Sequence, residues 1–562
     1  MDLSSSHPPE VNLTVDGVSV TVPQGSTLLE AALKAGVRVP TLCDHAALPR
    51  RAVCRLCVVE CDGSSRLRAA CATEVWEGAK IITSSPELHR IRKNILELLL
   101  IDHPDDCFVC PRNLNCELQL WATRFGVREK LFPSAVEPRV FNDSMTLVTD
   151  ISKCIKCGRC VSTCQEVQKV RALTTCGRSF QYGITTPHHQ PLSSGACVFC
   201  GTCATVCPVG AITDSDFTDE VWGHLAKPDQ KSIAIFSSEV LQGVEDALSL
   251  PTGSLGKGKL VTALKRIGFT YVWDRDFFGE LGVLGEALFL KNSCDVGKVT
   301  PIVSGCSLGF MNFINEYYPK LKHFILHHKR PEDLAKNIGD FSFKKIKKKS
   351  HIVVSFLPCI SRKYEVRGRI KGVPNWLTVD QALTVRELLK MIKTVSFDLL
   401  NLPETPFDQI SVPIGNVGLK GTLPRGSIDS MTLRLAEAIL GITREGEKGR
   451  PYVNKGSAPA IREFKVSYYG KKIDFFLVFG LAAAHEVLSS ASNRKVFPSY
   501  VRIMCCPQGC LGGGGQSFET IQRSWQERLN TEECTHKELG PEKLSQMEFT
   551  LPFFQDYFPL MF

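Results

Sequence analysis

The 562-residue sequence has no long hydrophobic segment, no secretory-signal pattern in its first residues and no phosphate-binding glycine loop. Its longest strongly apolar run, Ile95–Ile101, is far too short to cross a bilayer, so we expect no membrane span. Met1–Pro9 lacks the basic and apolar regions of a secretory signal and is not an Arg-rich amphipathic presequence. We therefore expect a soluble, cytoplasmic protein. Nucleotide binding is unsupported, because no GxGxxG motif follows a strand-like segment.

Cysteine, by contrast, is abundant, with 24 residues, and the chain is too long for a secreted disulfide scaffold. Two runs share the spacing C-x2-C-x2-C-x3-C, the pattern of bacterial two-cluster ferredoxins. Three close thiolates of each run hold one 4Fe–4S cluster, and the fourth cysteine crosses to the other cluster. Cluster one is therefore expected on Cys154, Cys157, Cys160 and Cys207, and cluster two on Cys197, Cys200, Cys203 and Cys164.

An earlier cysteine group follows a predicted hairpin and helix. Residues 11–22 alternate apolar and polar side chains around Asp16-Gly17, which predicts two strands joined by a tight turn. Residues 26–32 have the pattern of a capped amphipathic helix. The spacing C-x10-C-x2-C-x13-C that comes next resembles a plant-type 2Fe–2S ferredoxin domain with a lengthened first loop. It predicts one 2Fe–2S cluster on Cys43, Cys54, Cys57 and Cys71, with Cys61 packed in the core.

A third ligand group, His103-x3-Cys107-x2-Cys110-x5-Cys116, follows a predicted helix over residues 86–100. Three thiols and an imidazole can hold zinc. Their position between a 2Fe–2S segment and a two-cluster segment favours instead a 4Fe–4S cluster with one histidine ligand. Neutral imidazole in place of a thiolate tends to raise the reduction potential. The sequence thus predicts four accessory clusters, one 2Fe–2S and three 4Fe–4S.

The formal net charge of +9 suits an acidic partner, such as a ferredoxin or a flavodoxin-like electron carrier. The basic run Phe343–Lys349 has no interleaved aromatic residues, and we interpret it as a solvated surface. We therefore expect no nucleic acid partner.

From Ser232 onward, apolar strand-like segments alternate with helical ones, which predicts an α/β domain with two sheet-containing lobes. The expected strands are 232–236, 269–273, 351–356 and 473–480, and the expected helices include 385–393 and 431–440. Three cysteine segments are spread over this domain, at 301–310, 357–365 and 503–516. Cys506-x3-Cys510 with two distant thiols would make a four-thiolate site closed by the fold. The glycines at 512–515 would let the backbone approach a bulky cofactor.

These three segments resemble the signature motifs around the active-site H-cluster of FeFe-hydrogenases, and the order of the accessory clusters extends this resemblance over nearly the whole chain. The N-terminal third also resembles the iron–sulfur subunits of complex I and of NAD-linked formate dehydrogenases, but complex I-type subunits lack the three later motifs. The resemblance implies that Cys359, Cys506 and Cys510 bind a 4Fe–4S cube, and that Cys510 bridges to a two-iron site with carbon monoxide, cyanide and a dithiolate amine. It also implies hydrogenase maturation proteins as partners.

The implied fold is α+β and multidomain, in four parts. A ferredoxin-like β-grasp domain is expected at 1–88, a His/Cys3 cluster domain at 89–140, and a bacterial two-cluster ferredoxin domain at 141–222. A two-lobed α/β hydrogenase catalytic domain is expected at 230–562.

The first of the three motifs departs from the family pattern. It reads Ser304-Gly305-Cys306-Ser307, where the family has a proton-relaying cysteine followed by a ligand cysteine. Cys306 thus takes the relay position and Ser307 the ligand position, although serine is a hard donor with a high pKa. Three outcomes stay open at this point. Cys306 binds the cube instead, Ser307 binds weakly, or one corner of the cube has no protein ligand.

Other positions differ as well. Arg362 replaces a lysine near the two-iron site, and arginine is larger, planar and always charged. The two relay glutamates and the relay serine of the family fall on Gly285, Phe289 and Leu326, with Glu280 and Glu286 displaced nearby. The remaining thiols are expected to pack, and these are Cys505, Cys176, Cys294 and Cys534.

Two functions fit this pattern. The first is an FeFe-hydrogenase-family enzyme that exchanges electrons between a ferredoxin-like carrier and protons or hydrogen, with Cys306, Arg362 and Cys510 at the catalytic centre. The second is a catalytically impaired hydrogenase paralogue that serves as a redox sensor or electron-transfer subunit.

Overall fold

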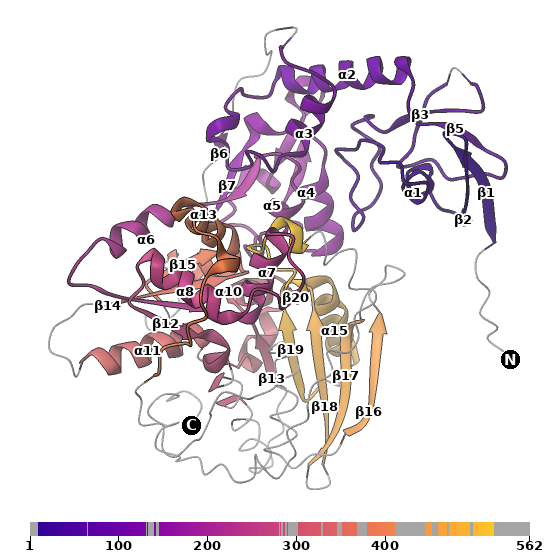
Figure 1. The fold of residues 1–562 in the computed structure, drawn as a ribbon. Helices are drawn as coiled ribbons and strands as arrows, with labels where there is room; N and C mark the ends of the chain where they lie inside the picture. Colours follow the sequence, from indigo (N-terminus) through magenta and orange to yellow (C-terminus); the bar gives the residue numbers. More distant parts are fainter. Residues whose placement is uncertain are drawn as a thin grey trace.

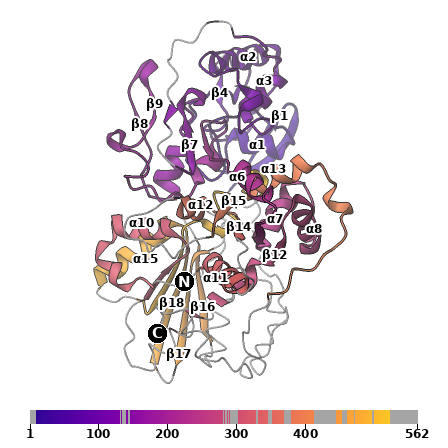
Figure 2. The same cartoon turned by 90° about the vertical axis from the view of Figure 1, so that its left-hand side faces the viewer.

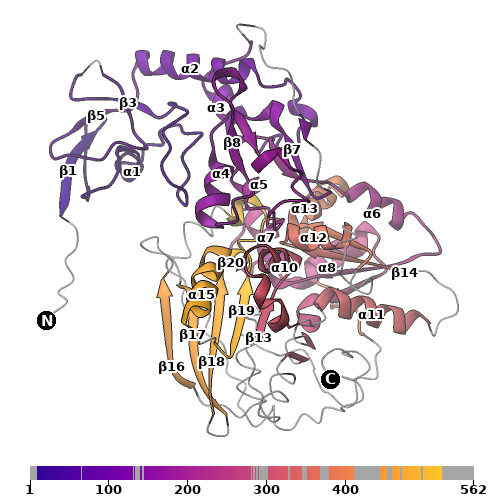
Figure 3. The same ribbon diagram turned by 180° about the vertical axis from the view of Figure 1, so that it is seen from behind.

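The computed structural model describes residues 9–64, 66–130, 132, 140–141, 145–279, 281–282, 285–286, 289, 302–326, 330–344, 351–367, 379–410, 444–451, 459–468, 471–494 and 498–521. The accessory modules lie at one end of the molecule and the two sheets of the C-terminal part at the other (Figure 1). Views from the side and from behind show the same division (Figures 2 and 3).

The N-terminal module is built on the predicted hairpin, which is confirmed. β1 (Glu10–Val15) and β2 (Val18–Pro23) pair antiparallel across Asp16 and Gly17, both of which have positive φ. β5 (Lys80–Ile82) joins β1 in parallel, and β3 (Val58–Cys61) and β4 (Arg68–Ala69) complete the sheet order β2-β1-β5-β3-β4. The predicted helix is α1 (Leu28–Lys34), which begins after Thr27 with a capping box to Glu30.

The middle of the chain forms short elements around its cysteine loops. α2 (Pro86–Ile101) confirms the helix predicted over 86–100, and α3 (Glu117–Arg124) packs against it. A small sheet has the order β10-β7-β6, and a separate hairpin pairs β8 with β9. The bounds are β6 (Val140–Phe141), β7 (Leu147–Asp150), β8 (Thr174–Cys176), β9 (Gly183–Thr185) and β10 (Ile212–Asp214). α4 (Arg159–Ser162) and α5 (Thr202–Val206) each begin after a glycine with positive φ, Gly158 and Gly201.

The first C-terminal sheet is entirely parallel, in the order β12-β11-β14-β15. Its strands are β11 (Lys231–Phe236), β12 (Tyr271–Asp274), β14 (His351–Leu357) and β15 (Gln381–Thr384). Helices pack on this sheet, and most of them enclose one large apolar core. They are α6 (Thr218–Leu225), α7 (Ser238–Ala247), α8 (Lys257–Ile267), α11 (Pro331–Lys344) and α13 (Val385–Val395).

The second C-terminal sheet has the order β13-β19-β18-β17-β16, parallel in its first three strands and antiparallel in the rest. Its strands are β13 (Ile302–Gly305), β16 (Arg444–Pro451), β17 (Pro459–Tyr468), β18 (Lys471–Phe479) and β19 (Tyr500–Met504). α10 (Leu308–Tyr317) and α15 (Leu481–Arg494) belong to this half, while α12 (Ile360–Arg367) follows β14 and β20 (Pro507–Cys510) follows β19.

The predicted alternation of strands and helices is therefore confirmed over the described residues. Strands 232–236, 269–273, 351–356 and 473–480 and helix 385–393 appear with their ends shifted by a few residues. The helix predicted at 431–440, the lysines at 345–349, Glu280, Cys294 and Cys534 lie outside the described residues. Within the part of the chain that the structure describes, no helix is both long and apolar enough to cross a membrane.

Candidate iron–sulfur sites and active-site cavity

The four cysteines of the N-terminal module form one group. Sγ of Cys57 lies 3.4 Å from Sγ of Cys71, and the Cys54 amide donates to Cys43 Sγ at 3.5 Å. Hydrogen bonds from the Cys54 and Cys71 thiols hold the pKa of Cys43 far below its usual range, against the effect of burial. Cys61 is 3% exposed in the core of the sheet and takes no part in the group. Four gathered thiols, in two close pairs, fit a binuclear 2Fe–2S cluster.

The four cysteines expected for cluster one line a single cavity of about 350 Å³, a volume that includes its open mouth. Cys154, Cys157 and Cys160 come from one loop, and Cys207 reaches the cavity from the other cysteine run. Apolar side chains such as Ile151, Ile184 and Ile212 form most of the remaining wall. The cavity therefore gathers the four thiols expected for cluster one, and their role as ligands stays a prediction.

The cysteines expected for cluster two also lie together. Burial, and then the negative charges of Cys200, Cys197 and Cys164, raise the pKa of Cys203 well above its usual range. Backbone amides face this group, since Ala172 donates to Cys164 Sγ at 3.2 Å and Phe199 donates to Cys197 Sγ at 3.4 Å. Such N–H···S bonds stabilise the reduced, more negative state of a cluster.

The His/Cys3 site lies against cluster one. A Cβ added at Gly210 would lie 2.6 Å from Cys110 Sγ, and the Glu117 amide donates to the Pro208 carbonyl at 2.9 Å. His103 is 9% exposed, and its buried Nδ1 has no hydrogen-bond partner within the described residues. Burial lowers the pKa of His103, so its ring is held neutral, the form that binds metals. An imidazole nitrogen with no partner among the described residues, shortly before Cys107, Cys110 and Cys116 in the sequence, fits a ligand role.

Among the described residues, no three His, Cys, Asp or Glu side chains converge as they would on one metal ion. A cluster takes its thiolates at different irons, so its ligands are spread more widely than those of a single ion. At the His/Cys3 site, a 4Fe–4S cluster in place of zinc stays a prediction from the position of the site between two cluster-binding segments.

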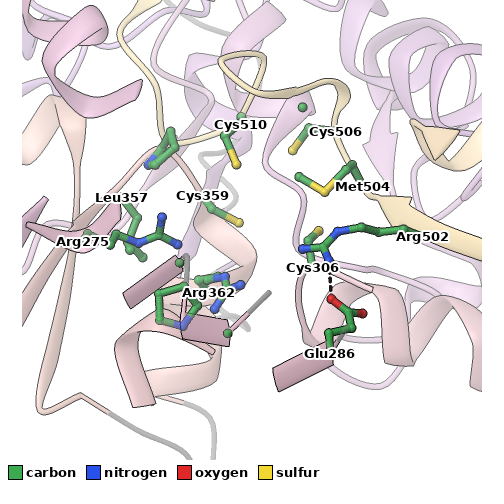
Figure 4. A pocket seen from close by; sticks show the side chains of 16 residues that line it. Arg275, Glu286, Cys306, Leu357, Cys359, Arg362, Arg502, Met504, Cys506 and Cys510 are labelled. Atoms are coloured by element: carbon green, nitrogen blue, oxygen red, sulfur yellow. Dashed lines mark hydrogen bonds and ion pairs between the residues drawn. The ribbon is translucent and has the colours of Figure 1, made fainter. Parts of the chain in front are cut away.

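The carboxyl ends of parallel strands from both C-terminal sheets meet at a second, larger cavity. Cys306 follows β13, Cys359 follows β14, and Cys506 follows β19, while Cys510 ends β20. All four thiols line this cavity of about 770 Å³, which includes its open mouth, and their sulfur atoms face it in Figure 4. Carboxyl ends of parallel strands are where α/β folds place their ligand sites.

Cys306 and Ser307 occupy different surroundings. Cys306 is on the cavity wall, whereas Ser307 is not among the lining residues and its Oγ lies 3.7 Å from Cys505 Sγ. The Cys505 amide donates to Cys306 Sγ at 3.4 Å. Hydrogen bonds from the Cys505 thiol and amide outweigh burial and lower the pKa of Cys306 to about 6. Cys505 itself is 2% exposed and packs in the apolar core of the second sheet, as predicted.

Two arginines on the cavity wall share one buried carboxylate. Glu332, at the start of α11, accepts from Arg275 Nε at 2.5 Å and from Arg362 Nη1 at 2.6 Å. Burial opposes ionisation of Glu332, but the two guanidinium groups lower its pKa to about 2. The triad keeps one positive charge in excess at the wall.

The opposite wall carries a second buried carboxylate, Glu286. Its two oxygens accept from the Tyr500 hydroxyl at 2.7 Å and from the Arg502 guanidinium (Figure 4 shows the latter contact). Among the described lining residues Glu286 is the one carboxylate. Leu326 is buried with an apolar side chain, so the serine position of the family offers no hydroxyl.

Sequence reasoning did not find Arg275, Glu332 or Arg502. They come from three elements without a shared motif, and only the packing of the two sheets brings them together. Their positions in the chain are a weak signal of a site, because Arg275 directly follows β12 and Glu332 lies at the start of α11.

The glycine run lets segments of backbone approach one another closely. A Cβ on Gly514 would lie 2.1 Å from the Cys200 carbonyl oxygen, and one on Gly513 would lie 2.0 Å from that of Pro358. The close approach is thus to two backbone segments, and only Gly513 of the four lines the cavity. As a result the cluster-two loop lies directly against the third motif.

Four family profiles match this architecture in order. They are a 2Fe-2S iron-sulfur cluster binding domain at 9–86, the NADH-ubiquinone oxidoreductase-G iron-sulfur binding region at 92–130, the ferredoxin-like domain of NADH-quinone oxidoreductase subunit 3 at 145–213, and the iron only hydrogenase large subunit, C-terminal domain, at 230–514. The chain belongs to the iron-only, or FeFe, hydrogenase family and carries iron–sulfur electron-transfer domains ahead of the hydrogenase domain.

Among curated proteins, it is 32% identical over 527 residues to the NADP-reducing hydrogenase subunit HndD of Solidesulfovibrio fructosivorans, covering 90% of this chain and 89% of the relative. Iron hydrogenase 1 of Clostridium pasteurianum is 24% identical with 90% and 88% coverage. The NADH-ubiquinone oxidoreductase 75 kDa subunit of Reclinomonas americana is 35% identical, but the match covers only 38% of this chain and 31% of that relative. The likeness to complex I subunits is therefore partial, as the sequence indicates.

Proposed function

We propose that this chain passes electrons between a ferredoxin-like or flavodoxin-like carrier and protons or hydrogen, and that it acts as a hydrogenase. The single observation that carries the proposal is the convergence of Cys306, Cys359, Cys506 and Cys510 on one cavity beside the loop of Cys200. The likeness to a subunit named as NADP-reducing hydrogenase supports the same activity.

The proposed cluster ligands are the groups of cysteines, with His103, described above. A 2Fe–2S cluster would sit on the cysteines of the N-terminal module, and three 4Fe–4S clusters on the His/Cys3 site, cluster one and cluster two. A fifth, active-site cluster would be an H-cluster on the cavity thiols, inserted by maturation proteins. The four proposed domains, at 1–88, 89–140, 141–222 and 230–562, each hold their own sites.

Cys306, and not Ser307, is the proposed fourth ligand of the cube. It faces the cavity with the other three thiols, and its thiolate is stabilised by the Cys505 amide. A thiolate is the softer donor and the better ligand for iron–sulfur iron. Ser307 would then complete the packing beneath the site.

An H-cluster supplies, when bound, a redox-active two-iron site for the interconversion of protons and hydrogen. Arg275 and Arg362 would bind an anionic group there, and Glu332 fixes the direction of both guanidinium groups. Glu286 would handle protons at the cavity, because its Oε1 is hydrogen-bonded to Tyr500 and the carboxylate reaches the wall. This route would replace the relay thiol that becomes a ligand.

One observation favours a second function, an electron-carrying paralogue without hydrogen chemistry. If Cys306 is a ligand, no described lining residue offers a free thiol at the relay position. If Glu286 does not carry protons in place of that thiol, electrons would stop at the cube.

The test is infrared spectroscopy of anaerobically matured protein together with hydrogen release from reduced viologen. Carbonyl and cyanide bands with hydrogen release are the expected result. Bands without release would favour the electron carrier, and accessory clusters without bands would overturn the H-cluster. The matched control is Cys359→Ser, which should lose the bands while keeping the accessory clusters.

A further inference from the structure

A buried arginine lies between the His/Cys3 site and cluster one. Arg112 stands in the loop between Cys110 and Cys116 and is 4% exposed. Its Nη2 donates to the carbonyl of Cys207 at 2.8 Å. Cys110 and Cys116 are expected ligands of one cluster, and Cys207 is an expected ligand of the next. The guanidinium group therefore lies at the junction of two predicted clusters.

The other buried cations of this region have carboxylate partners. Among the described residues from 103 to 213, three lysine or arginine side chains are buried, namely Arg112, Lys153 and Arg159. Lys153 pairs with Asp106 at 2.7 Å, and Arg159 pairs with Glu117 at 2.6 Å. The charges of Lys153 and Arg159 are thus compensated within the chain.

Arg112 has no such partner. Within the described part of the chain it forms no ion pair with a carboxylate, and its buried Nε and Nη1 atoms have no hydrogen-bond partner. Burial lowers the pKa of Arg112, and the thiolate of Cys207 is the strongest of the charges that oppose this effect. A guanidinium group stays protonated in proteins. Two buried N–H donors beside a full positive charge fit a negatively charged neighbour with sulfur acceptors.

An aromatic ring is the other close neighbour of Arg112. The ring centre of Phe518 lies 3.7 Å from Cζ of Arg112 and 4.9 Å from Cζ of Arg386. Arg386 pairs with Asp214 at 2.7 Å, so its charge is compensated. The ring favours a cation at its face but carries no net charge, so the charge of Arg112 is not neutralised. Because Arg112 is buried, this charge acts on its neighbours more strongly than a solvated charge would.

We propose that Arg112 sets the reduction potential of cluster one by holding an uncompensated positive charge beside it. The inference rests on the proposed function and identifies a residue that tunes one of its clusters. Reduction adds one electron, which the carrier supplies, and makes the cluster more negative by one charge, with no bond made or broken. A fixed positive charge stabilises this reduced state and raises the potential.

The test is a redox titration of the holoprotein, followed by electron paramagnetic resonance of the reduced clusters. The signal that Cys154→Ser removes identifies cluster one. Arg112→Gln keeps a hydrogen-bond donor but removes the charge. We expect the potential of cluster one to fall by at least about 59 mV, a tenfold change in the ratio of reduced to oxidised cluster. Arg112→Lys keeps the charge and should restore most of the wild-type potential.

Arg92→Met is the matched control. Arg92 is 5% exposed and donates to the carbonyls of Thr83 at 2.8 Å and Val58 at 2.7 Å, all within the N-terminal module and α2. Its replacement removes a buried arginine elsewhere and should leave the potential of cluster one unchanged. In Arg112→Gln, conversely, the potential of the 2Fe–2S cluster should not change.

An unchanged potential of cluster one in loaded Arg112→Gln would overturn the role of Arg112 alone. Equal falls in Arg112→Gln and Arg112→Lys would overturn it too, because donor geometry and not charge would then set the potential. Arg112→Met is a second neutral variant, and loss of the cluster from both neutral variants would assign Arg112 to cluster assembly instead. If Cys154→Ser removes no signal from the wild-type spectrum, the proposed ligand set fails, and the tuning role fails with it.

Discussion

Cys306 and Ser307 are adjacent in the chain but face different parts of the molecule. The thiol lies on the cavity wall, and the hydroxyl lies next to the buried Cys505. Which of them binds iron can be decided by single-atom changes.

We expect Cys306→Ser to lose the iron of one cubane, because a serine hydroxyl is a poor ligand for iron–sulfur iron. Ser307→Ala should keep it, since the methyl group leaves the thiol ligand in place. Mössbauer spectra and iron content of anaerobically purified protein measure the difference. Retention of the cubane in the first variant and its loss in the second would assign the ligand to Ser307.

Glu286 provides a second residue-scale prediction. Glu286→Gln keeps the size of the side chain but cannot hold and release a proton, so hydrogen release should fall at least about a hundredfold. The infrared bands of the active-site cofactor should persist. Equal loss of the bands and of activity would mean that Glu286 supports the cavity and does not move protons.

At the scale of elements, Glu332 at the start of α11 joins the segment after β12, through Arg275, to α12, through Arg362. Glu332→Gln should destabilise the protein by about 3 kcal/mol at neutral pH, because two buried guanidinium groups lose their counter-charge. The pKa of Glu332 is lowered to about 2, so its contribution is fully present above its ordinary value and is lost only as pH falls toward 2. The difference in unfolding temperature between wild type and variant should therefore be constant from pH 6 to 8. A difference that grows or vanishes in that range would contradict this assignment.

The third motif and the cluster-two loop make another element-scale contact. A Cβ at Gly514 would collide with the Cys200 carbonyl, so Gly514→Ala must move one of the two backbones. We expect electrons to pass more slowly from the accessory clusters to the cavity. The rate is measured in protein that evolves hydrogen, by stopped-flow detection of the oxidation of its reduced accessory clusters. Gly223→Ala is the control, because its Cβ would meet open space. Equal rates in both variants would show that the contact does not set the transfer distance.

Features formed by residues close together in the chain could be predicted from the sequence, and features formed by the packing of distant elements could not. The accessory ligand sets could be read from spacing, because most of their members, such as Cys154, Cys157 and Cys160, lie within one short loop. Short continuous apolar runs located strands such as β11 and β14, since both strands are buried along nearly their whole length. The pairing of Arg275 with Glu332 could not be read, because it depends on how two distant elements pack. Spacing alone could not show that Gly514 lies against the Cys200 carbonyl, because this contact also depends on how distant segments pack.

At the scale of the whole molecule, Arg159 connects the N-terminal module, the His/Cys3 segment and the cluster-one segment. Its guanidinium donates to the Asp44 carbonyl at 2.6 Å and pairs with Glu117 at 2.6 Å, while its backbone belongs to the cluster-one loop. Arg159→Met should release the N-terminal module from the rest and increase the radius of gyration in small-angle X-ray scattering. The proposed 4Fe–4S clusters should then be reduced more slowly through the 2Fe–2S site. Arg90→Met is the control, since Arg90 pairs at the surface with Glu87 alone. Unchanged scattering would mean that other contacts hold the module.

The contact between the cluster-two loop and the third motif also bears on how the protein is made. Gln168 donates to the Cys505 carbonyl across 337 residues of sequence, and Gly514 lies over Cys200 in the same region. Chains emerge from the ribosome from the N-terminus, and early domains fold first. The loop of cluster two is therefore complete long before the segment that covers it has been synthesised. During that interval the loop is uncovered, which gives iron and sulfide a period of free access before the chain closes over it.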